Sequence, residues 1–217
     1  MPDPSESCPR CQKTVPLCVC EGITPLAHRI EVLILQHPRE QDKELGTARL
    51  CALSLEKATL KIGLSWPSLG ILLERKVDPK RWAVAYLGSV RPAALAPSAE
   101  ILVVDAKGTL LGAQEAVLQS LEGVILLDGT WSEAKALWWR NPWMLKTRRL
   151  VLGPRRPSRY GRTRREPRRE GLATIEAAGL MLARLEGRPE IEATLTAHFE
   201  RQLARYKSLL SPTAGPA

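Results

Sequence analysis

The 217-residue sequence lacks any apolar run of the roughly 18 to 20 residues that a membrane-spanning helix needs. Its start, MPDPSESCPRC, also lacks the succession of basic, apolar and small residues that marks a secretory signal. We therefore expect a cytoplasmic protein without a membrane partner. The 44% of hydrophobic residues is ordinary for a globular protein and is enough to form one sizeable core.

Three common nucleotide and hydrolase motifs are also missing. The sequence contains no GxGxxG, no GxxxxGK[ST] and no GxSxG pattern. The usual dinucleotide-binding loop, phosphate-binding loop and nucleophile elbow are thereby excluded. Any small molecule that binds must be held by other loops.

Acidic residues are nearly absent from one segment. Residues 140–169 contain twelve basic residues and one acid, Glu166, so this segment carries +11 while the whole chain carries +9. A near-neutral body with one dense basic segment indicates a polyanionic partner, and arginine forks pair with phosphates and stack on bases. A solvated loop and an acidic membrane surface are the alternatives. No amphipathic apolar face accompanies the charges, so nucleic acid is favoured.

Four of the five cysteines lie near the N-terminus, as Cys8-x-x-Cys11 and Cys18-x-Cys20. Thiolates this close on two tight turns can share one tetrahedral Zn²⁺ ion. Disulfides and an unstructured tail with idle thiols are the alternatives, and a reducing compartment disfavours disulfides. The fifth, Cys51, lies in an apolar helical stretch and is expected to be a core thiol.

Apolar runs of strand length alternate with helical patterns along the chain. This alternation predicts an α/β fold with a mostly parallel sheet covered on both faces. The expected strands are residues 29–36, 59–64, 82–87, 101–105, 124–127 and 148–153. The expected helices are residues 47–57, 110–122, 132–140, 172–186 and 190–210. A loop rich in Pro, Gly and Arg is expected at residues 154–171.

One tetrapeptide lies where an apolar run stops and a helical pattern starts. It is Asp128-Gly129-Thr130-Trp131, and it brings a carboxylate, a glycine, a helix-opening hydroxyl and an aromatic ring to a strand end. In α/β proteins, ligands bind in the crevice beyond the carboxyl ends of the strands. The sequence therefore predicts a functional site at this point.

Several motifs in the same order resemble the DTW-domain family, the tRNA-uridine aminocarboxypropyltransferases. The resemblance extends from Cys8 to about Ala178, with one departure at Ala173, where the family pattern has serine. The motifs are the four clustered cysteines, His37-Pro38-Arg39-Glu40 followed by Lys43, Thr47 and Arg49, Asp128-Gly129-Thr130-Trp131 followed by Ala134 and Lys135, and Ala173-Thr174-Ile175-Glu176-Ala177.

The resemblance implies a SPOUT-like fold with a C-terminal trefoil knot. It implies a four-cysteine zinc knuckle over residues 1–25 and a catalytic domain over residues 26–217. The implied reaction transfers the 3-amino-3-carboxypropyl group of S-adenosyl-L-methionine to N3 of a uridine in tRNA, which leaves methylthioadenosine. A SPOUT-type RNA methyltransferase and a non-catalytic, zinc-containing RNA-binding protein are the alternatives.

For the catalytic residues, the resemblance leads to Asp128 and Trp131. Asp128 is expected either to remove the N3 proton or to bind the ammonium or ribose of the cofactor, and helix capping is its structural alternative. Trp131 is expected to stack on uracil or adenine, or else to pack in the core. The tryptophans at 138, 139 and 143 are expected to be structural.

The remaining predicted contacts follow from the resemblance and, for the arginines after residue 148, from the charge of the basic segment. Free N–H groups at the start of the 172–186 helix are expected to hold the cofactor carboxylate, with ordinary capping as the alternative. The predicted cofactor-binding residues are Leu87, Gly88, Ser89, Leu127, Gly129, Thr130, Thr174 and Glu176. The predicted RNA-binding residues are Arg49, Arg155, Arg156, Arg159, Arg162, Arg164, Arg165, Arg168 and Arg169. A surface salt bridge is the alternative for Arg49, and His37, Glu40 and Lys43 are expected beside the site.

Overall fold

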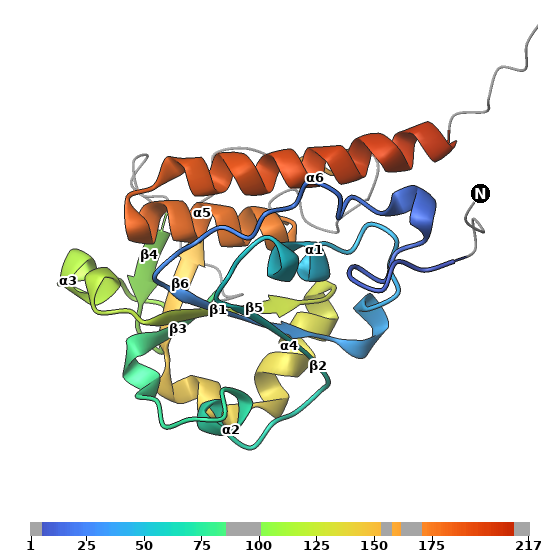
Figure 1. Ribbon diagram of the computed structural model, residues 1–217. Helices are drawn as coiled ribbons and strands as arrows, with labels where there is room; N and C mark the ends of the chain where they lie inside the picture. The colour runs from blue at the N-terminus through green and yellow to red at the C-terminus, as the bar shows by residue number, and fades with distance from the viewer. Residues whose placement is uncertain (1–5, 86–100, 153–157, 162–170, 211–217) are drawn as a thin grey trace, which may run out of the picture.

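The computed structural model describes residues 6–85, 101–152, 158–161 and 171–210, and the alternation of strands and helices predicted from the sequence is present (Figure 1). Six strands form one sheet in the order β2-β1-β5-β3-β6-β4. All neighbouring strands are parallel except β4, which pairs antiparallel with β6 at the sheet edge. The strands are β1 (Glu31–Gln36), β2 (Ala58–Ile62), β3 (Trp82–Ala85), β4 (Ile101–Val104), β5 (Gly123–Asp128) and β6 (Arg148–Leu152).

Helices cover both faces of this sheet. On one face lie α1 (Ala48–Leu53), α5 (Thr174–Glu186) and α6 (Pro189–Leu210), and on the other lie α2 (Leu69–Leu72) and α4 (Trp131–Arg140). Helix α3 (Gln114–Gln119) lies beside β4. Short 3₁₀ helices add η1 (Val15–Leu17), η2 (Pro38–Glu40), η3 (Pro79–Arg81) and η5 (Pro142–Lys146).

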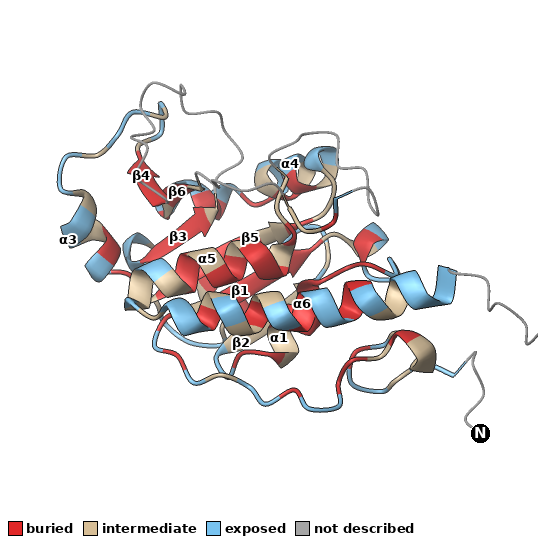
Figure 2. Cartoon of the chain, turned by 90° about the horizontal axis from the view of Figure 1, so that it is seen from above, coloured by how far each residue is buried: buried red, intermediate tan, exposed pale blue. Residues whose placement is uncertain are grey.

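The two faces of the sheet each bury an apolar core. Successive side chains of a strand point to opposite faces, so Ile34 joins the core under α5 and α6, while Leu33 and Leu35 join the core with Trp82 and Met144. Figure 2 shows the buried strands beneath α5 and α6; α5 is mostly buried or half-buried, and the outer face of α6 is exposed. Burial on both faces is the reason why these strands are almost wholly apolar, as predicted.

The connections that follow β1 and β5 leave the sheet on opposite sides. After β1 the chain crosses to α1, and after β5 it crosses to α4. Adjacent parallel strands whose connections diverge in this way leave a crevice at their carboxyl ends. The last residues of the two strands, Gln36 and Asp128, are register partners at this crevice.

Two predicted helices are shorter in the structure because side chains bind nearby backbone groups. The helix expected over residues 47–57 ends at Leu53, where the Ser54 hydroxyl donates to the carbonyl of Leu50 at 2.8 Å. The helix expected over residues 110–122 begins only at Gln114. Its side-chain amide accepts from the Val103 N–H at 2.7 Å and donates to the Val103 carbonyl at 2.8 Å, which fixes the chain against β4.

Helix α2 and the 3₁₀ helices had no strong sequence pattern and were not predicted. The hydroxyl of Ser68 accepts from the Ile71 N–H at 3.2 Å and so caps α2. The other predicted helices and strands are present with shifted ends. Residues 86 and 87 of one expected strand, residue 153 of another and most of the expected loop over residues 154–171 lie outside the described residues.

The N-terminal cysteine segment packs directly on the main body. Val19 and Ile23 belong to the core beneath α5 and α6. Two arginines of α6 also bind the backbone of this segment. Arg201 donates to the Glu21 carbonyl at 3.1 Å, and Arg205 donates to the carbonyl of Cys18. The segment and α6 are therefore one packed unit.

None of the helices in the described part of the chain combines the length and the apolar character that crossing a membrane would require.

A glycine in β5 is required by the close approach of an aromatic ring. A Cβ atom added at Gly123 would lie 2.5 Å from the ring of Trp82, which is fully buried and has no room to move. We expect Gly123→Ala to lower the free energy of unfolding by about 1–3 kcal/mol, the usual cost of overpacking a core. Urea denaturation measures this loss. The matched Gly112→Ala, whose added Cβ meets nothing within 4 Å, should leave stability nearly unchanged.

Candidate active site and cysteine centre

The carboxylate of Asp128 lies in the crevice between β1 and β5 and is held by two neutral donors. Its exposed fraction is 8%. The side-chain amide of Gln36 donates to Oδ2 at 2.8 Å, and the hydroxyl of Thr174 donates to Oδ1. These three side chains come from the ends of two strands and the start of α5. The structure thus brings together two of the predicted site residues, Asp128 and Thr174.

Gln36 is a site residue that the sequence analysis missed. It is 3% exposed, and a buried amide needs hydrogen-bond partners. The signal was a polar residue between the apolar run 32–35 and His37. Its register with Asp128 depends on the pairing of β1 with β5, which the sequence did not reveal.

The residues after Asp128 form a tight turn into α4. The Thr130 hydroxyl accepts from the Glu133 N–H at 3.4 Å, and the Glu133 carboxylate accepts from the Thr130 N–H at 2.9 Å, which is a capping box. Thr130, and not Asp128, therefore caps this helix, so the capping alternative for Asp128 is wrong. A Cβ at Gly129 would lie 2.9 Å from the Glu133 Cβ, so glycine permits the turn to be this close.

The start of α5 is held by a buried carboxylate. Glu176 accepts from the Ala173 N–H at 2.8 Å, the Arg159 N–H at 2.9 Å and the Ser158 hydroxyl at 2.6 Å. The Ile175 N–H donates to the hydroxyl of Thr47 at 3.3 Å. Capping, the alternative for Glu176, is therefore present, and two N–H groups at this helix start have partners within the protein.

The described part of the arginine-rich segment lies against α6 and the loop after β1. The Arg159 side chain pairs with Glu200 at 2.6 Å. The Tyr160 hydroxyl donates to the Leu45 carbonyl at 2.7 Å, and its ring meets Phe199 edge to face at 4.9 Å. Among the predicted RNA-binding arginines, this segment contributes Arg159, and the half-buried Arg49 lies on α1.

Other predicted site residues lie outside the described part of the chain. They are the cofactor residues Leu87, Gly88 and Ser89 and the RNA-binding residues Arg155, Arg156, Arg162, Arg164, Arg165, Arg168 and Arg169.

The tryptophans differ sharply in exposure. Trp143 is buried, and Trp138 is half-buried beneath the guanidinium of Arg149, whose Cζ lies 5.2 Å from the ring centroid. Trp131 is 36% exposed at the edge of the site. Trp139 is 71% exposed, so the expectation that it is structural is wrong as far as core packing is concerned.

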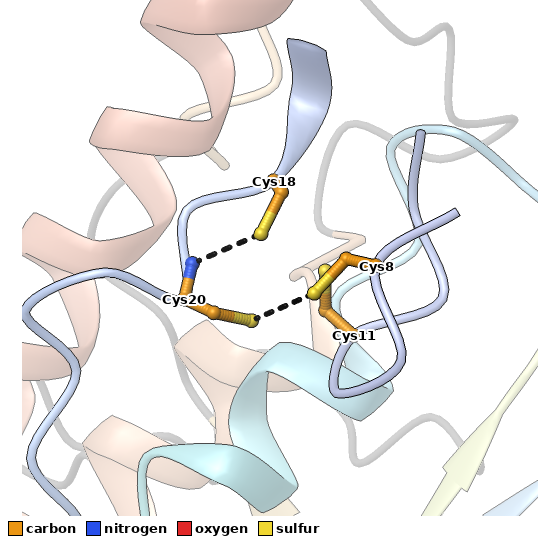
Figure 3. Close-up of side chains that lie close together, drawn as sticks. All are labelled: Cys8, Cys11, Cys18 and Cys20. Atoms are coloured by element: carbon orange, nitrogen blue, oxygen red, sulfur yellow. Dashed lines mark hydrogen bonds between the residues drawn. The ribbon is translucent and has the colours of Figure 1, made fainter. Parts of the chain in front are cut away.

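The four N-terminal cysteines form a compact cluster (Figure 3). Their Sγ atoms all lie within 4.8 Å of one another, and their side chains turn toward a common centre. The Cys8 and Cys20 sulfurs are 3.9 Å apart, which matches the edge of about 3.8 Å of a ZnS₄ tetrahedron with bonds of about 2.3 Å. It is far longer than an S–S bond of about 2.05 Å. The thiol set therefore fits a tetrahedral Zn²⁺ ion and not a disulfide.

The thiols differ in how readily they lose a proton. Burial raises the pKa of Cys11 and of Cys20. Burial also disfavours the thiolate of Cys8, but hydrogen bonds from the backbone at Cys11 and Arg10 and from neighbouring thiols outweigh it and lower the pKa of Cys8 to about 7.

Cys51 does not belong to this cluster. It is fully buried in α1 among apolar side chains, so the prediction of a core thiol is confirmed.

The cysteine segment reaches the loop that follows β1. The ammonium group of Lys13 donates to the Lys43 carbonyl, close to Gly46. This loop starts at His37, whose N–H donates to the Asp128 carbonyl at 2.9 Å. The cysteine centre therefore supports one wall of the Asp128 crevice.

Comparison with known families agrees with this geometry. Residues 5–207 match the model of the DTW domain. The chain belongs to the DTW-domain family. The DTW match spans the cysteine cluster, the Asp128 turn and the start of α5, so the resemblance found in the sequence is confirmed.

Several curated DTW relatives carry the name tRNA-uridine aminocarboxypropyltransferase 2. The protein from Drosophila melanogaster is 30% identical over 198 residues, which cover 89% of this chain and 72% of the relative. The proteins from Macaca fascicularis and Mus musculus are each 28% identical, and each alignment covers 87% of this chain but 59% of the relative. No solved structure matches the chain.

The cysteine cluster can be tested by counting metal ions. We expect one Zn²⁺ per chain in the purified protein, measured by plasma mass spectrometry. Cys20→Ser should abolish stoichiometric zinc and lower the melting temperature, because the metal then no longer stabilises the folded state. The matched Cys51→Ala also removes a buried thiol but should retain one zinc. Equal metal content in both variants would contradict the site.

Proposed function

We propose that this protein transfers the 3-amino-3-carboxypropyl group of S-adenosyl-L-methionine to N3 of a uridine in tRNA. The observation that carries the proposal is the Asp128 carboxylate, held by Gln36 and Thr174 in the crevice of a DTW-family chain. The names of the fly, macaque and mouse relatives support the same reaction. The products are acp3U in the RNA and free methylthioadenosine.

The chemistry is a displacement at the Cγ atom of the methionine part of the donor, which is bonded to the sulfonium. A bond forms between uridine N3 and this carbon, the carbon–sulfur bond breaks, and its electron pair stays on sulfur. The thioether leaves as a neutral molecule and needs no general acid. The enzyme must therefore align the two substrates and accept the N3 proton.

Asp128 is the proposed acceptor of that proton. Both of its donors are neutral, so they orient the carboxylate without compensating its charge. Each carboxylate oxygen retains a lone pair for a further hydrogen bond. A second role for Asp128, binding the cofactor ammonium, uses the same free lone pairs. Trp131, three residues later, would stack on the uracil or on the adenine.

The proposal also includes the residues that surround the cofactor and the fold that carries them. The proposed cofactor-binding residues are Leu87, Gly88, Ser89, Leu127, Gly129, Thr130, Thr174 and Glu176. The proposed fold is SPOUT-like with a C-terminal knot, divided into a cysteine knuckle (residues 1–25) and a catalytic domain (residues 26–217). The proposed role of Zn²⁺ is structural, and the proposed compartment is the cytoplasm.

Isotope labels in the donor test the reaction. Carboxyl-labelled S-adenosyl-L-methionine should transfer acid-stable label to tRNA, whereas methyl-labelled S-adenosyl-L-methionine should transfer none. Methyl label in the RNA would instead establish a methyltransferase. In calorimetry, tRNA binding without any binding of S-adenosyl-L-methionine would establish a non-catalytic RNA-binding protein.

The role of Asp128 is tested by Asp128→Asn, which keeps the side-chain size and removes the charge. We expect turnover to fall by about 10²- to 10⁴-fold, the usual contribution of a positioned base. The affinity for S-adenosyl-L-methionine, measured by calorimetry, should change little. An equally large loss of affinity would assign Asp128 to cofactor binding instead.

A further inference from the structure

Helix α4 presents a stripe of aromatic and basic side chains to the solvent. Trp131, Lys135 and Trp139 are all exposed and are spaced four residues apart. At 100° per residue they occupy an arc of about 80°, and they extend about 12 Å along the helix. The opposite side of α4 buries Ala134 and Leu137 against the sheet. We refer to Trp131, Lys135 and Trp139 as the α4 stripe.

Trp139 is the most exposed large apolar side chain in the described part of the chain, at 71%. Its neighbour Trp138 is half-buried beneath Arg149 and needs no further partner. A tryptophan so far out of the core gains nothing from burial within this chain. Such side chains are enriched where a protein stacks against a ligand.

The exposed charges along α4 and η5 have one sign. The exposed basic residues Lys135, Arg140 and Lys146 lie on α4 and η5. The one acid between residues 131 and 149 is Glu133, and its carboxylate is turned inward onto Thr130. An aromatic surface with only positive charges along it favours a polyanion with flat rings over a protein partner.

The α4 stripe is continuous with the candidate active site. Trp131 follows Asp128 by three residues, and α4 then runs along the sheet face opposite α5 and α6 (Figure 1). A strand of RNA with one base at Asp128 would therefore meet Trp131 first, Lys135 next and Trp139 last.

We propose that the α4 stripe binds the single-stranded nucleotides next to the target uridine. This inference rests on the proposed function and adds the way in which the RNA is held. Trp131 keeps the stacking role that the proposed function gives it, Trp139 stacks on a base of the neighbouring nucleotides, and Lys135 pairs with a phosphate between the two rings. Stacking of this kind tolerates any base, so the stripe supplies affinity and direction and leaves base selection to the crevice.

Binding of a fluorescent, unmodified tRNA transcript, followed by anisotropy at several salt concentrations, tests the stripe. Trp139→Ala should weaken binding by about 5- to 150-fold, because stacking on one aromatic side chain contributes about 1–3 kcal/mol. The slope of log affinity against log salt should stay the same. Lys135→Ala should reduce that slope by about 0.7, the value for one phosphate contact with a single strand. Trp139→Phe should retain most of the affinity.

Two exposed residues away from the stripe provide controls. Leu209→Ala removes an exposed apolar side chain from α6, on the other face of the sheet, and Lys57→Ala removes an exposed cation from the turn before β2. Both should bind tRNA as the unchanged protein does. Circular dichroism verifies that each variant is folded.

Unchanged tRNA affinity of Trp139→Ala would overturn the inference. If the same variant also changed the oligomeric state in ultracentrifugation, the surface would be an interface between copies. The proposed function fails separately. Should the unchanged protein bind tRNA through Trp139 yet transfer no carboxyl label, the reaction would be wrong and the RNA surface would stand.

Discussion

The buried carboxylate of Asp128 joins three distant parts of the chain. Gln36 ends β1, Asp128 ends β5 and Thr174 begins α5. Hydrogen bonds from Gln36 and Thr174 to the Asp128 carboxylate hold these three elements together at the crevice. A carboxylate out of water needs such partners, because an unpaired buried charge would destabilise the fold by several kcal/mol. The two strands must therefore pair in register, and α5 must return to the same edge of the sheet.

Other contacts around the crevice also join segments that are distant in sequence. Glu176 ties the start of α5 to residues 158 and 159 of the arginine-rich segment, and Lys13 ties the cysteine segment to the loop after β1. The Thr130 capping box sets the direction of α4. Each contact joins residues far apart in sequence or fixes where a helix begins. Four segments of the chain thus contribute to the site around the carboxyl ends of β1 and β5.

Much of this architecture followed from local patterns. Apolar runs predicted the strands, because a strand covered on both faces must be apolar, and the cysteine spacing predicted the cluster. The order of the strands, the partnership of Gln36 with Asp128 across 92 positions and the shortened α3 depend on tertiary contacts that no local window contains. Trp139 shows the same limit. A tryptophan in a helical pattern favours the core, and only its position on the packed helix reveals that it faces solvent.

The hydrogen bonds between α6 and the cysteine segment have a consequence for folding during translation. Arg201 and Arg205, near the end of the described chain, donate to carbonyls at Glu21 and Cys18, near its beginning. The ribosome therefore makes the cysteine segment long before it makes the two arginines of α6. The cysteine segment must wait through nearly all of translation for its helical support. A metal ion that gathers the four thiols early would give this nascent segment a fixed shape before α6 emerges to hold it.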